Sequence, residues 1–367
     1  MDGRQRMINI MQGKPTDRVS WTTISDDITR ADMPEEYKNI PILDFYRKIG
    51  CDILQFGPYG LPENAAPQEP FEIASGVSES YKVLEDGAFV HLRSFQGSSL
   101  SSVSKTGHPF RHPVSTAREL KLLLEMTESY SVTPRDAGYL ESCARCDGAI
   151  GGDGIYVPTF SPSPVQQLIE YECGVEGFYN LLADEPELME RVIDALFAVT
   201  LRKYEIMAEK SPFIAAIPVE NTSTALISPK LYRKYSLPHM RAFSDVMHKY
   251  GKKAIIHMCG HVYHLLDSLK ETDLDGIHAL TTPPIGDCPF EAALDALGDD
   301  LIIIGGLDGT VFHSPYANAE DIRDCINKTL TPRIRNSNFI LGIGTDGLRT
   351  DLWRISAVRD ALEDMRR

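Results

Sequence analysis

Short apolar runs alternate with longer amphipathic stretches along most of the chain, the pattern of strands alternating with helices around a parallel sheet. Several short runs are almost entirely aliphatic, and Leu-Ile-Ile-Ile at 301–304 is the clearest of them. Uninterrupted apolar strands are typical of sheets covered on both faces. We expect about eight such strands, near residues 19–24, 52–56, 149–158, 214–219, 254–258, 276–280, 301–305 and 339–344. This number predicts an α/β protein whose sheet closes into a (β/α)8 TIM barrel.

Local signals mark the ends of the expected helices. Ser228 followed by Pro229 is an N-cap with proline at the first helical position, and Gly251 ends that helix before the next strand. Pro238, inside the same segment, predicts a kink. Residues 351–367 carry apolar side chains on one stripe, so we expect a final helix packed on the barrel exterior.

Two regions do not fit a minimal barrel. Residues 71–101 alternate in the manner of strands around Glu85-Asp86-Gly87, which predicts an antiparallel β meander inserted after the second strand. The connection at 109–145 is predicted to contain helical pieces, and it ends in Cys143-Ala-Arg-Cys146. We interpret these two cysteines as packing residues in preference to a metal-binding or redox pair. We therefore expect a single domain over 1–367 with an insertion at about 71–145.

Composition and charge exclude some classes of function. The apolar fraction of 43% and charged fraction of 24% are ordinary for a globular protein. A formal charge of −15 disfavours nonspecific binding of nucleic acid. No apolar run approaches the length of a membrane span and no signal peptide is recognised, so we expect no membrane association and a cytoplasmic location. Seven cysteines, an odd number, favour reduced thiols over a disulfide framework.

The segment Ile-Ile-His257-Met-Cys259-Gly places a histidine and a cysteine two residues apart at the end of an expected strand. In an extended segment such residues point to the same side. An imidazole and a thiolate that converge are half of a soft-metal site, with zinc as the first choice. The alternative interpretation is a core cysteine beside a hydrogen-bonded histidine.

Other polar residues follow or end neighbouring strands, where TIM-barrel enzymes place their chemistry. They are Glu220, Asn221, His278, Asp308 and Asp346. Each has an alternative interpretation as a cap or a loop hydrogen bond, above all the two aspartates beside glycines. Because the fourth and fifth strands are neighbours, we expect Glu220 to reach the same centre as the histidine and the cysteine. Three protein ligands and one open position describe a catalytic zinc site.

Four segments carry a resemblance to a known family. These are Met11-Gln-Gly-Lys-Pro-Thr-Asp-Arg-Val, the stretch 220–229 with its following Leu237-Pro238, the His257-x-Cys259-Gly260 element, and Gly342-Ile-Gly-Thr-Asp346. The chain resembles the uroporphyrinogen decarboxylase superfamily and, within it, the corrinoid-dependent methyltransferases. The resemblance covers nearly the whole chain and implies a βα barrel.

Two departures from that family shape the functional hypothesis. The decarboxylases carry an arginine-rich tract on the first strand that binds propionates, whereas residues 19–27 contain no arginine here. We therefore discount porphyrinogen decarboxylation. Members that methylate a thiol add a second cysteine at the end of the last strand, where this chain has Thr345 followed by Asp346. A zinc ion with one thiolate fewer is more electrophilic and better suited to an oxygen leaving group.

The resulting hypothesis is a methyltransferase that moves a methyl group from an aromatic methyl ether to the Co(I) corrinoid of a separate carrier protein. Zinc held by Glu220, His257 and Cys259, or a proton from His278 or Asp346, would offset the charge that grows on the ether oxygen.

We expect the substrate to contact further residues at the rim of the barrel. Tyr156 and Phe160 would stack on its ring, although packing at the barrel mouth explains them equally well. Asn221 and Asp308 complete the expected substrate-binding set. No corrinoid-binding domain is recognised, so the corrinoid should arrive on a partner protein that docks on the open barrel face.

Three alternatives remain open. A methylcobamide:thiol methyltransferase of the coenzyme M type would use a substitute ligand from Cys288 or Asp346. A uroporphyrinogen decarboxylase would need no metal. A binding module without enzymatic activity would retain no metal and turn over no methyl donor.

Overall fold

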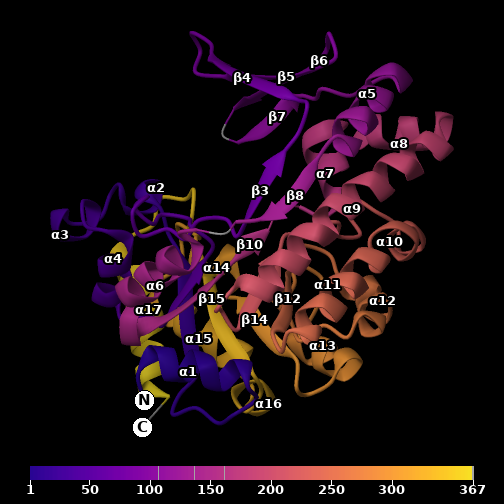
Figure 1. The fold of residues 1–367 in the computed structure, drawn as a ribbon. Coiled ribbons are helices and arrows are strands. Elements are labelled where there is room, and N and C mark those ends of the chain that lie inside the picture. The colour runs from indigo at the N-terminus through magenta and orange to yellow at the C-terminus, as the bar shows by residue number, and fades with distance from the viewer. Residues whose placement is uncertain (106, 136, 161, 366–367) are drawn as a thin grey trace.

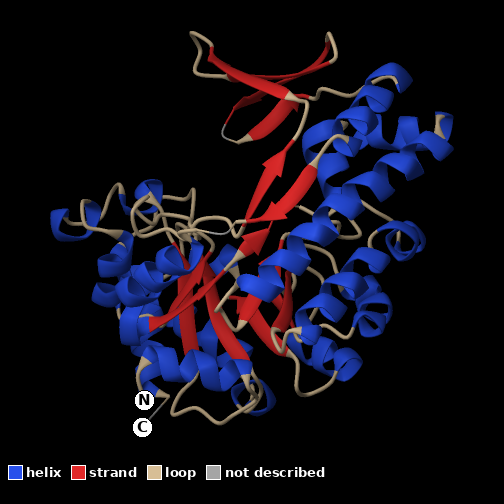
Figure 2. Cartoon of the chain, in the orientation of Figure 1, coloured by secondary structure: helices blue, strands red, loops and turns tan. Residues whose placement is uncertain are grey.

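Seven parallel strands form one curled sheet in the computed structural model, which describes residues 1–105, 107–135, 137–160 and 162–365 (Figures 1 and 2). Their order is β1-β15-β14-β13-β12-β11-β10. The strands are β1 (Ser20–Ile24), β10 (Thr159–Phe160), β11 (Ala215–Pro218), β12 (Lys253–His257), β13 (Gly276–Leu280), β14 (Ile302–Gly306) and β15 (Phe339–Gly344).

A second parallel pair, β2 (Ile53–Phe56) with β9 (Gly154–Val157), completes the barrel-like arrangement. The Asp52 amide donates to the carbonyl of Trp21 over 2.9 Å, which joins β2 to β1. The other member of the pair, β9, leads directly into β10, which pairs with β11. Each of the eight expected strands is therefore confirmed, although the third begins at Gly154 rather than near 149. Residues 149–150 instead complete α6, where Ile150 is buried.

The interior of the barrel is filled by alternate strand residues and by one face of the first helix, α1 (Gly3–Met11). Figure 1 shows α1 at the end of the barrel opposite the antiparallel sheet. Its Met7, Ile10 and Met11 join a buried cluster of strand side chains. These strand residues are Leu54, Ile155, Val157, Ala215, Ile217, Ile255, Ile302, Ile304 and Ile340. The apolar plug closes this end, so the opposite end is the one available for chemistry.

Helices surround the sheet. The longer ones are α4 (Ile42–Ile49), α5 (Ala117–Glu128), α6 (Tyr139–Ile150), α8 (Gly174–Asp184), α9 (Pro186–Lys210), α10 (Pro229–Tyr235), α11 (Leu237–Lys249), α13 (Phe290–Leu297), α15 (Ala319–Thr329) and α17 (Leu352–Asp364). The short ones are α2 (Asp27–Arg30), α3 (Glu35–Lys38), α7 (Pro164–Gln167), α12 (Leu266–Leu269), α14 (Gly309–Phe312) and α16 (Pro332–Arg335). No helix of the described chain is both long and apolar enough to cross a membrane.

The helix boundaries follow the sequence signals. The Ser228 side chain accepts a hydrogen bond from the amide of Leu231, as expected of an N-cap before Pro229. The chain breaks between α10 and α11 at Ser236, which confirms the predicted kink near Pro238. The terminal helix α17 is also confirmed.

An antiparallel segment follows β2 and projects beyond the barrel (Figure 1). Its stem pairs β3 (Phe71–Ala74) with β8 (Ser131–Pro134), and its outer sheet contains β4 (Ser78–Val83), β5 (Phe89–Phe95), β6 (Ser98–Lys105) and β7 (His108–Arg111). Arg93 of this sheet donates two hydrogen bonds to Glu172, of 2.9 and 2.5 Å, and both side chains are largely buried. This ion pair fastens the outer sheet to the helical layer. Cys143 and Cys146 are buried free thiols on α6, so packing is their role in the structure.

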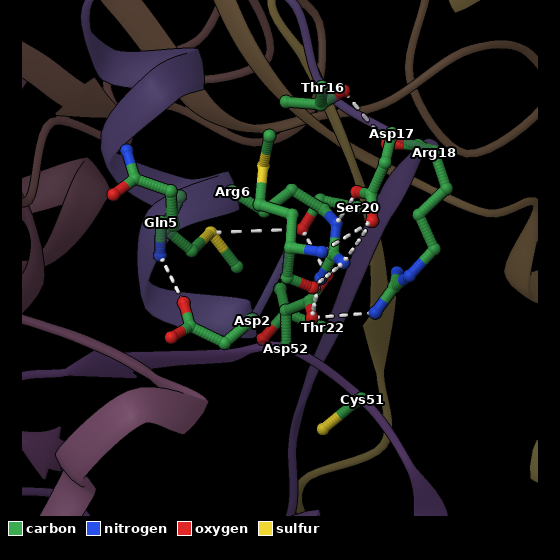
Figure 3. Close-up of polar contacts among 12 residues, drawn as sticks. Asp2, Gln5, Arg6, Thr16, Asp17, Arg18, Ser20, Thr22, Cys51 and Asp52 are labelled. Carbon is green, nitrogen blue, oxygen red and sulfur yellow. Dashed lines mark hydrogen bonds and ion pairs between the residues drawn. The ribbon is translucent and has the colours of Figure 1, made fainter.

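A buried ion cluster ties α1 to the start of β1 and to Asp52 before β2 (Figure 3). The Asp52 carboxylate accepts hydrogen bonds from Arg6 over 2.5 Å, from Arg18 over 2.6 Å and from Ser20 over 2.8 Å. Arg6 also bonds to Asp17 over 2.8 Å. Because Arg6 and Asp52 are each 4% exposed or less, these charges depend on one another for compensation.

Candidate active site at the barrel mouth

A cavity of about 720 Å³ opens at the C-terminal ends of the barrel strands. Its walls include residues of β1, β2, β12, β13, β14 and β15, and apolar side chains such as Phe56, Ile285 and Leu348 cover much of it. The polar side chains that face it include those of Tyr59, His257, His278, His313 and Asp346. A largely apolar pocket with a few convergent polar groups is the usual form of a small-molecule site.

Two histidines meet at this cavity. Strands β12 and β13 pair in a register that sets His257 beside His278, and their Nδ1 atoms lie 2.7 Å apart. The ring of His278 stacks on Phe56 with centroids 4.7 Å apart. Burial lowers the pKa of both imidazoles, that of His257 to about 4, so both rings are neutral near pH 7. A hydrogen bond between neutral rings needs one donor and one acceptor, so the ring that accepts at Nδ1 carries its proton on Nε2.

A carboxyl group lies at the rim of the same cavity. Loss of solvent, and after it the charge of Asp26, raises the pKa of Asp346. Asp26 itself accepts hydrogen bonds from the Tyr59 hydroxyl over 3.2 Å and from the Gly347 amide over 2.8 Å. His313 donates from Nε2 to the carbonyl of Gly344 over 2.9 Å. The predicted residues His278 and Asp346 are thus placed at one cavity, although their roles there stay predictions.

The expected zinc ligands do not assemble. Within the described ranges, no three His, Cys, Asp or Glu side chains come together in a way that could hold a metal ion. Neither Glu220 nor Cys259 lines the cavity that His257 faces. The Cys259 thiol instead donates to the side-chain oxygen of Asn221 over 3.3 Å.

Local geometry explains this departure from the predicted cluster. Strand β12 ends at His257, and the left-handed Gly260 (φ 86°) follows shortly after it, so the alternation of an extended strand does not apply to Cys259. Glu220 lies beyond the end of β11 and is fully buried, and its charge acts on Tyr204 of α9 and Tyr232 of α10. These residues do not fit a three-ligand zinc site.

Two aromatic residues predicted at the mouth face elsewhere. Tyr156 packs on Phe213 with ring centroids 4.7 Å apart, and Phe160 meets Tyr204 edge-on at 5.0 Å. The alternation of β9 accounts for the first, because its neighbours Ile155 and Val157 occupy the barrel interior and turn Tyr156 toward the helices. The prediction that Tyr156 and Phe160 stack on a substrate at the mouth is therefore wrong.

The remaining predicted contacts have local roles. Asp308 caps the short α14, accepting hydrogen bonds from the amide of Thr310 over 2.8 Å and from its hydroxyl over 2.7 Å. It lines a neighbouring groove of about 660 Å³, so the capping interpretation is the one that the structure confirms. The side-chain oxygen of Asn221 is bonded to the amide and thiol of Cys259. Neither Asp308 nor Asn221 faces the barrel-mouth cavity.

Three residues of the cavity escaped the sequence-based prediction. Phe56 is the last residue of β2 and Tyr59 follows it, whereas His313 comes just after α14 in the connection that follows β14. The position of Phe56 at the end of β2 and of His313 in the connection after β14 was the available signal, because the C-terminal ends of barrel strands and the loops that follow them converge on one mouth. Among the described lining residues there is no lysine or arginine, which leaves no side-chain cation for a polycarboxylate.

Comparison with known proteins finds similarity in both sequence and structure. A methylated-thiol–coenzyme M methyltransferase from Methanosarcina mazei is 27% identical over 159 residues, which cover 42% of this chain and 40% of that relative. A solved methyltransferase structure from Methanosarcina mazei superposes with a TM-score of 0.59 at 14% identity, over 100% of this chain and 99% of the other. A D-psicose 3-epimerase structure covers 66% of this chain and 86% of its own at a TM-score of 0.38 and 12% identity, too distant to support an argument.

The sequence model of one family matches residues 95–363, and its description is uroporphyrinogen decarboxylase (URO-D). The match takes in every barrel strand from β9 onward, together with the two histidines and Asp346. Because it spans well over half of the chain, this protein belongs to the uroporphyrinogen decarboxylase (URO-D) family.

Proposed function

We propose that this chain is a corrinoid-dependent methyltransferase that takes a methyl group from an aromatic methyl ether. The observation that carries the proposal is the neutral His257–His278 pair, which lies against Phe56 in a cavity whose described lining contains no lysine or arginine. The two Methanosarcina mazei methyltransferases support the reaction class. The aromatic ether is an inference from the apolar character of the cavity.

The proposed reaction is a displacement at the methyl carbon. The Co(I) corrinoid of a separate carrier protein supplies the nucleophile when it is bound. The methyl–oxygen bond breaks, its electron pair stays on the oxygen, and the product is a phenol once that oxygen gains a proton. The neutral histidine pair lines the cavity and can donate a hydrogen bond from Nε2–H to the oxygen as its charge grows. The proton itself can come from Asp346 in its acid form, because the pKa of Asp346 is raised, or from solvent.

The chain's remaining contribution is to hold the substrate. Phe56 lines the cavity beside both histidines, with centroid distances of 4.7 Å to His278 and 5.6 Å to His257. An aromatic substrate can pack on its free surface while the ether oxygen approaches an imidazole. An apolar wall also keeps water away from the reacting oxygen, which strengthens a hydrogen bond to it.

A methylated thiol is the second candidate donor or product, and the similarity to the M. mazei methylated-thiol–coenzyme M methyltransferase favours it. The residue that replaces the second cysteine of such enzymes argues against it. Thr345 is buried, and its hydroxyl is bonded to Ser25 over 2.7 Å and to the carbonyl of Ile24 over 2.7 Å. A hydroxyl already bonded in this way is a poor substitute for a thiolate ligand.

The test is methyl transfer by the purified protein to Co(I) carrier protein or free cob(I)alamin. Donors are a panel of methoxybenzoates, with methylated thiols as the competing arm, and the readouts are methylcobalamin absorbance and released phenol. We expect phenol release, and a loss of about 10²- to 10⁴-fold in His278→Asn. The matched control is His264→Asn, since His264 is exposed and outside the cavity. Methyl transfer from thiols alone would contradict the ether assignment.

A further inference from the structure

Oε1 of Gln55 and Nδ1 of His239 are two of the five buried side-chain atoms that lie without hydrogen-bond partners among the described residues. The other three are Oε2 of Glu220 and the hydroxyl oxygens of Tyr204 and Tyr232. All three side chains are fully buried. Leaving a buried polar atom unpaired costs folding free energy, and native proteins satisfy nearly all such atoms with protein or ordered water. The three unpaired oxygen atoms therefore call for a common explanation.

These three oxygen atoms belong to one region of the fold, between the barrel wall and the helices that cover it. Tyr204 lies on α9, Tyr232 on α10, and Glu220 just beyond the end of β11. Tyr204 packs edge-on against Phe160 of β10, which pairs with β11. The hydroxyl of Thr222, two residues after Glu220, lies 3.4 Å from that of Ser236, the C-cap residue of α10. Consistent with this arrangement, burial and after it the Glu220 carboxylate raise the pKa of both phenols. The other carboxyl oxygen, Oε1, accepts from the amide of Thr222 over 3.3 Å. Oε2 is the carboxyl oxygen that has no partner.

We propose that Glu220 Oε2 and the hydroxyls of Tyr204 and Tyr232 bind one ordered water molecule behind the barrel wall. A buried water typically makes about three hydrogen bonds, which is the number of free oxygen atoms here. The donors and acceptors also match, because the carboxyl oxygen accepts while each phenol can either donate or accept.

The chemistry of the three oxygens favours water over a cation. Two of the three groups are neutral phenols, so a divalent ion would keep an uncompensated charge in the protein interior. Zinc prefers nitrogen and sulfur ligands, and calcium takes six or more oxygens. The site therefore assigns Glu220 to bound water rather than to the zinc ion expected from the sequence.

The bound water also has a consequence for the barrel mouth. The Glu220 amide donates to the His257 carbonyl over 2.8 Å, and Val219 forms an isolated parallel bridge to His257. Fixing the Glu220 side chain therefore fixes the backbone that carries His257. Glu220 is a positioning residue that lies outside the cavity, and this inference does not depend on the identity of the methyl donor.

The direct test is a crystal structure that resolves ordered solvent. We expect a solvent peak about 2.6–3.2 Å from each of the three oxygens. Tyr204→Phe and Tyr232→Phe should each lower Tm by about 1–4 °C, because each removes a bond to the water. Tyr316→Phe is the matched control, since Tyr316 is 93% exposed, and its Tm should not change. No peak, together with an unchanged or higher Tm in both buried variants, would overturn the proposal.

Two further measurements separate water from an ion and test positioning. Tm should be the same in sodium, potassium and choline chloride, and Glu220→Gln should leave the metal content of the protein unchanged. Glu220→Gln, whose amide oxygen still accepts from water, should retain the wild-type NMR shifts of the His257 ring, whereas Glu220→Leu should move them. A cation-dependent Tm, a loss of metal in Glu220→Gln, or equal His257 shifts in both variants would contradict the assignment. None of these readouts requires methyl transfer.

Discussion

The Nδ1 atoms of His257 and His278 lie 2.7 Å apart because β12 and β13 pair in a register that sets the two residues side by side. This contact makes the two imidazoles one unit, since the tautomer of each ring depends on the other. We expect His257→Asn and His278→Asn to lower kcat/KM by similar factors, and the double variant to lose little more than either single one. Steady-state kinetics of the four proteins checks this. Losses that multiply in the double variant would show independent roles.

The carboxylate of Asp52 gives a stability prediction of a different kind. It compensates Arg6 and Arg18 at the closed end of the barrel (Figure 3), and Asp52→Asn removes the negative charge that the two guanidinium groups share. We expect a loss of about 3–5 kcal/mol in the free energy of unfolding, measured by chemical denaturation. Asp360→Asn is the control, because Asp360 is exposed and pairs with its neighbour Arg359, and its effect should stay within about 0.5 kcal/mol. Equal effects of the two substitutions would refute the role of the cluster.

The strands were predictable because a parallel sheet covered on both faces needs unbroken apolar runs, as at residues 301–304. The start of the third strand, expected near residue 149, was not predictable, because an apolar residue such as Ile150 suits a buried helix face as well as a strand. The capping signal at Ser228–Pro229 depends only on local sequence, and the structure confirms it.

The site was predictable only in part. That His257, His278 and Asp346 approach one mouth follows from their positions at strand ends. Which side chain meets which depends on the register between β12 and β13 and on the point where β12 ends, and neither is encoded locally. The strand ended two residues too early for Cys259 to share the direction of His257, so the contact is between two histidines.

Burial of His239 makes stability depend on pH. The side chain packs against Phe197 with the rings tilted and their centroids 4.3 Å apart, and burial lowers its pKa to about 4. An unfolded chain binds a proton at this histidine below about pH 6.5, whereas the folded protein does not until about pH 4. The free energy of unfolding should therefore fall by about 1.4 kcal/mol per pH unit across that window from this group alone. His239→Leu should remove this part of the slope in denaturation curves between pH 7 and about pH 4.

A control separates this effect from other titrations. His264→Leu changes the same residue type at an exposed position and should keep the wild-type slope. If His239→Leu kept the slope too, protonation of His239 would not be the cause.

The pairing of Arg93 with Glu172 predicts how the outer antiparallel sheet responds to mutation. These side chains make a bidentate ion pair, and Glu172 is 3% exposed, so the pair is screened little by solvent. Glu172→Gln leaves the Arg93 charge without compensation where it is largely buried. We expect faster amide hydrogen exchange across β4–β7 in this variant, while the barrel strands β12–β15 keep their protection. Glu79→Gln is a matched control on the sheet itself, because Glu79 is exposed and bonds to its neighbours Tyr81 and His91. Uniformly faster exchange over sheet and barrel alike would show that the pair stabilises the whole fold rather than the attachment of the sheet.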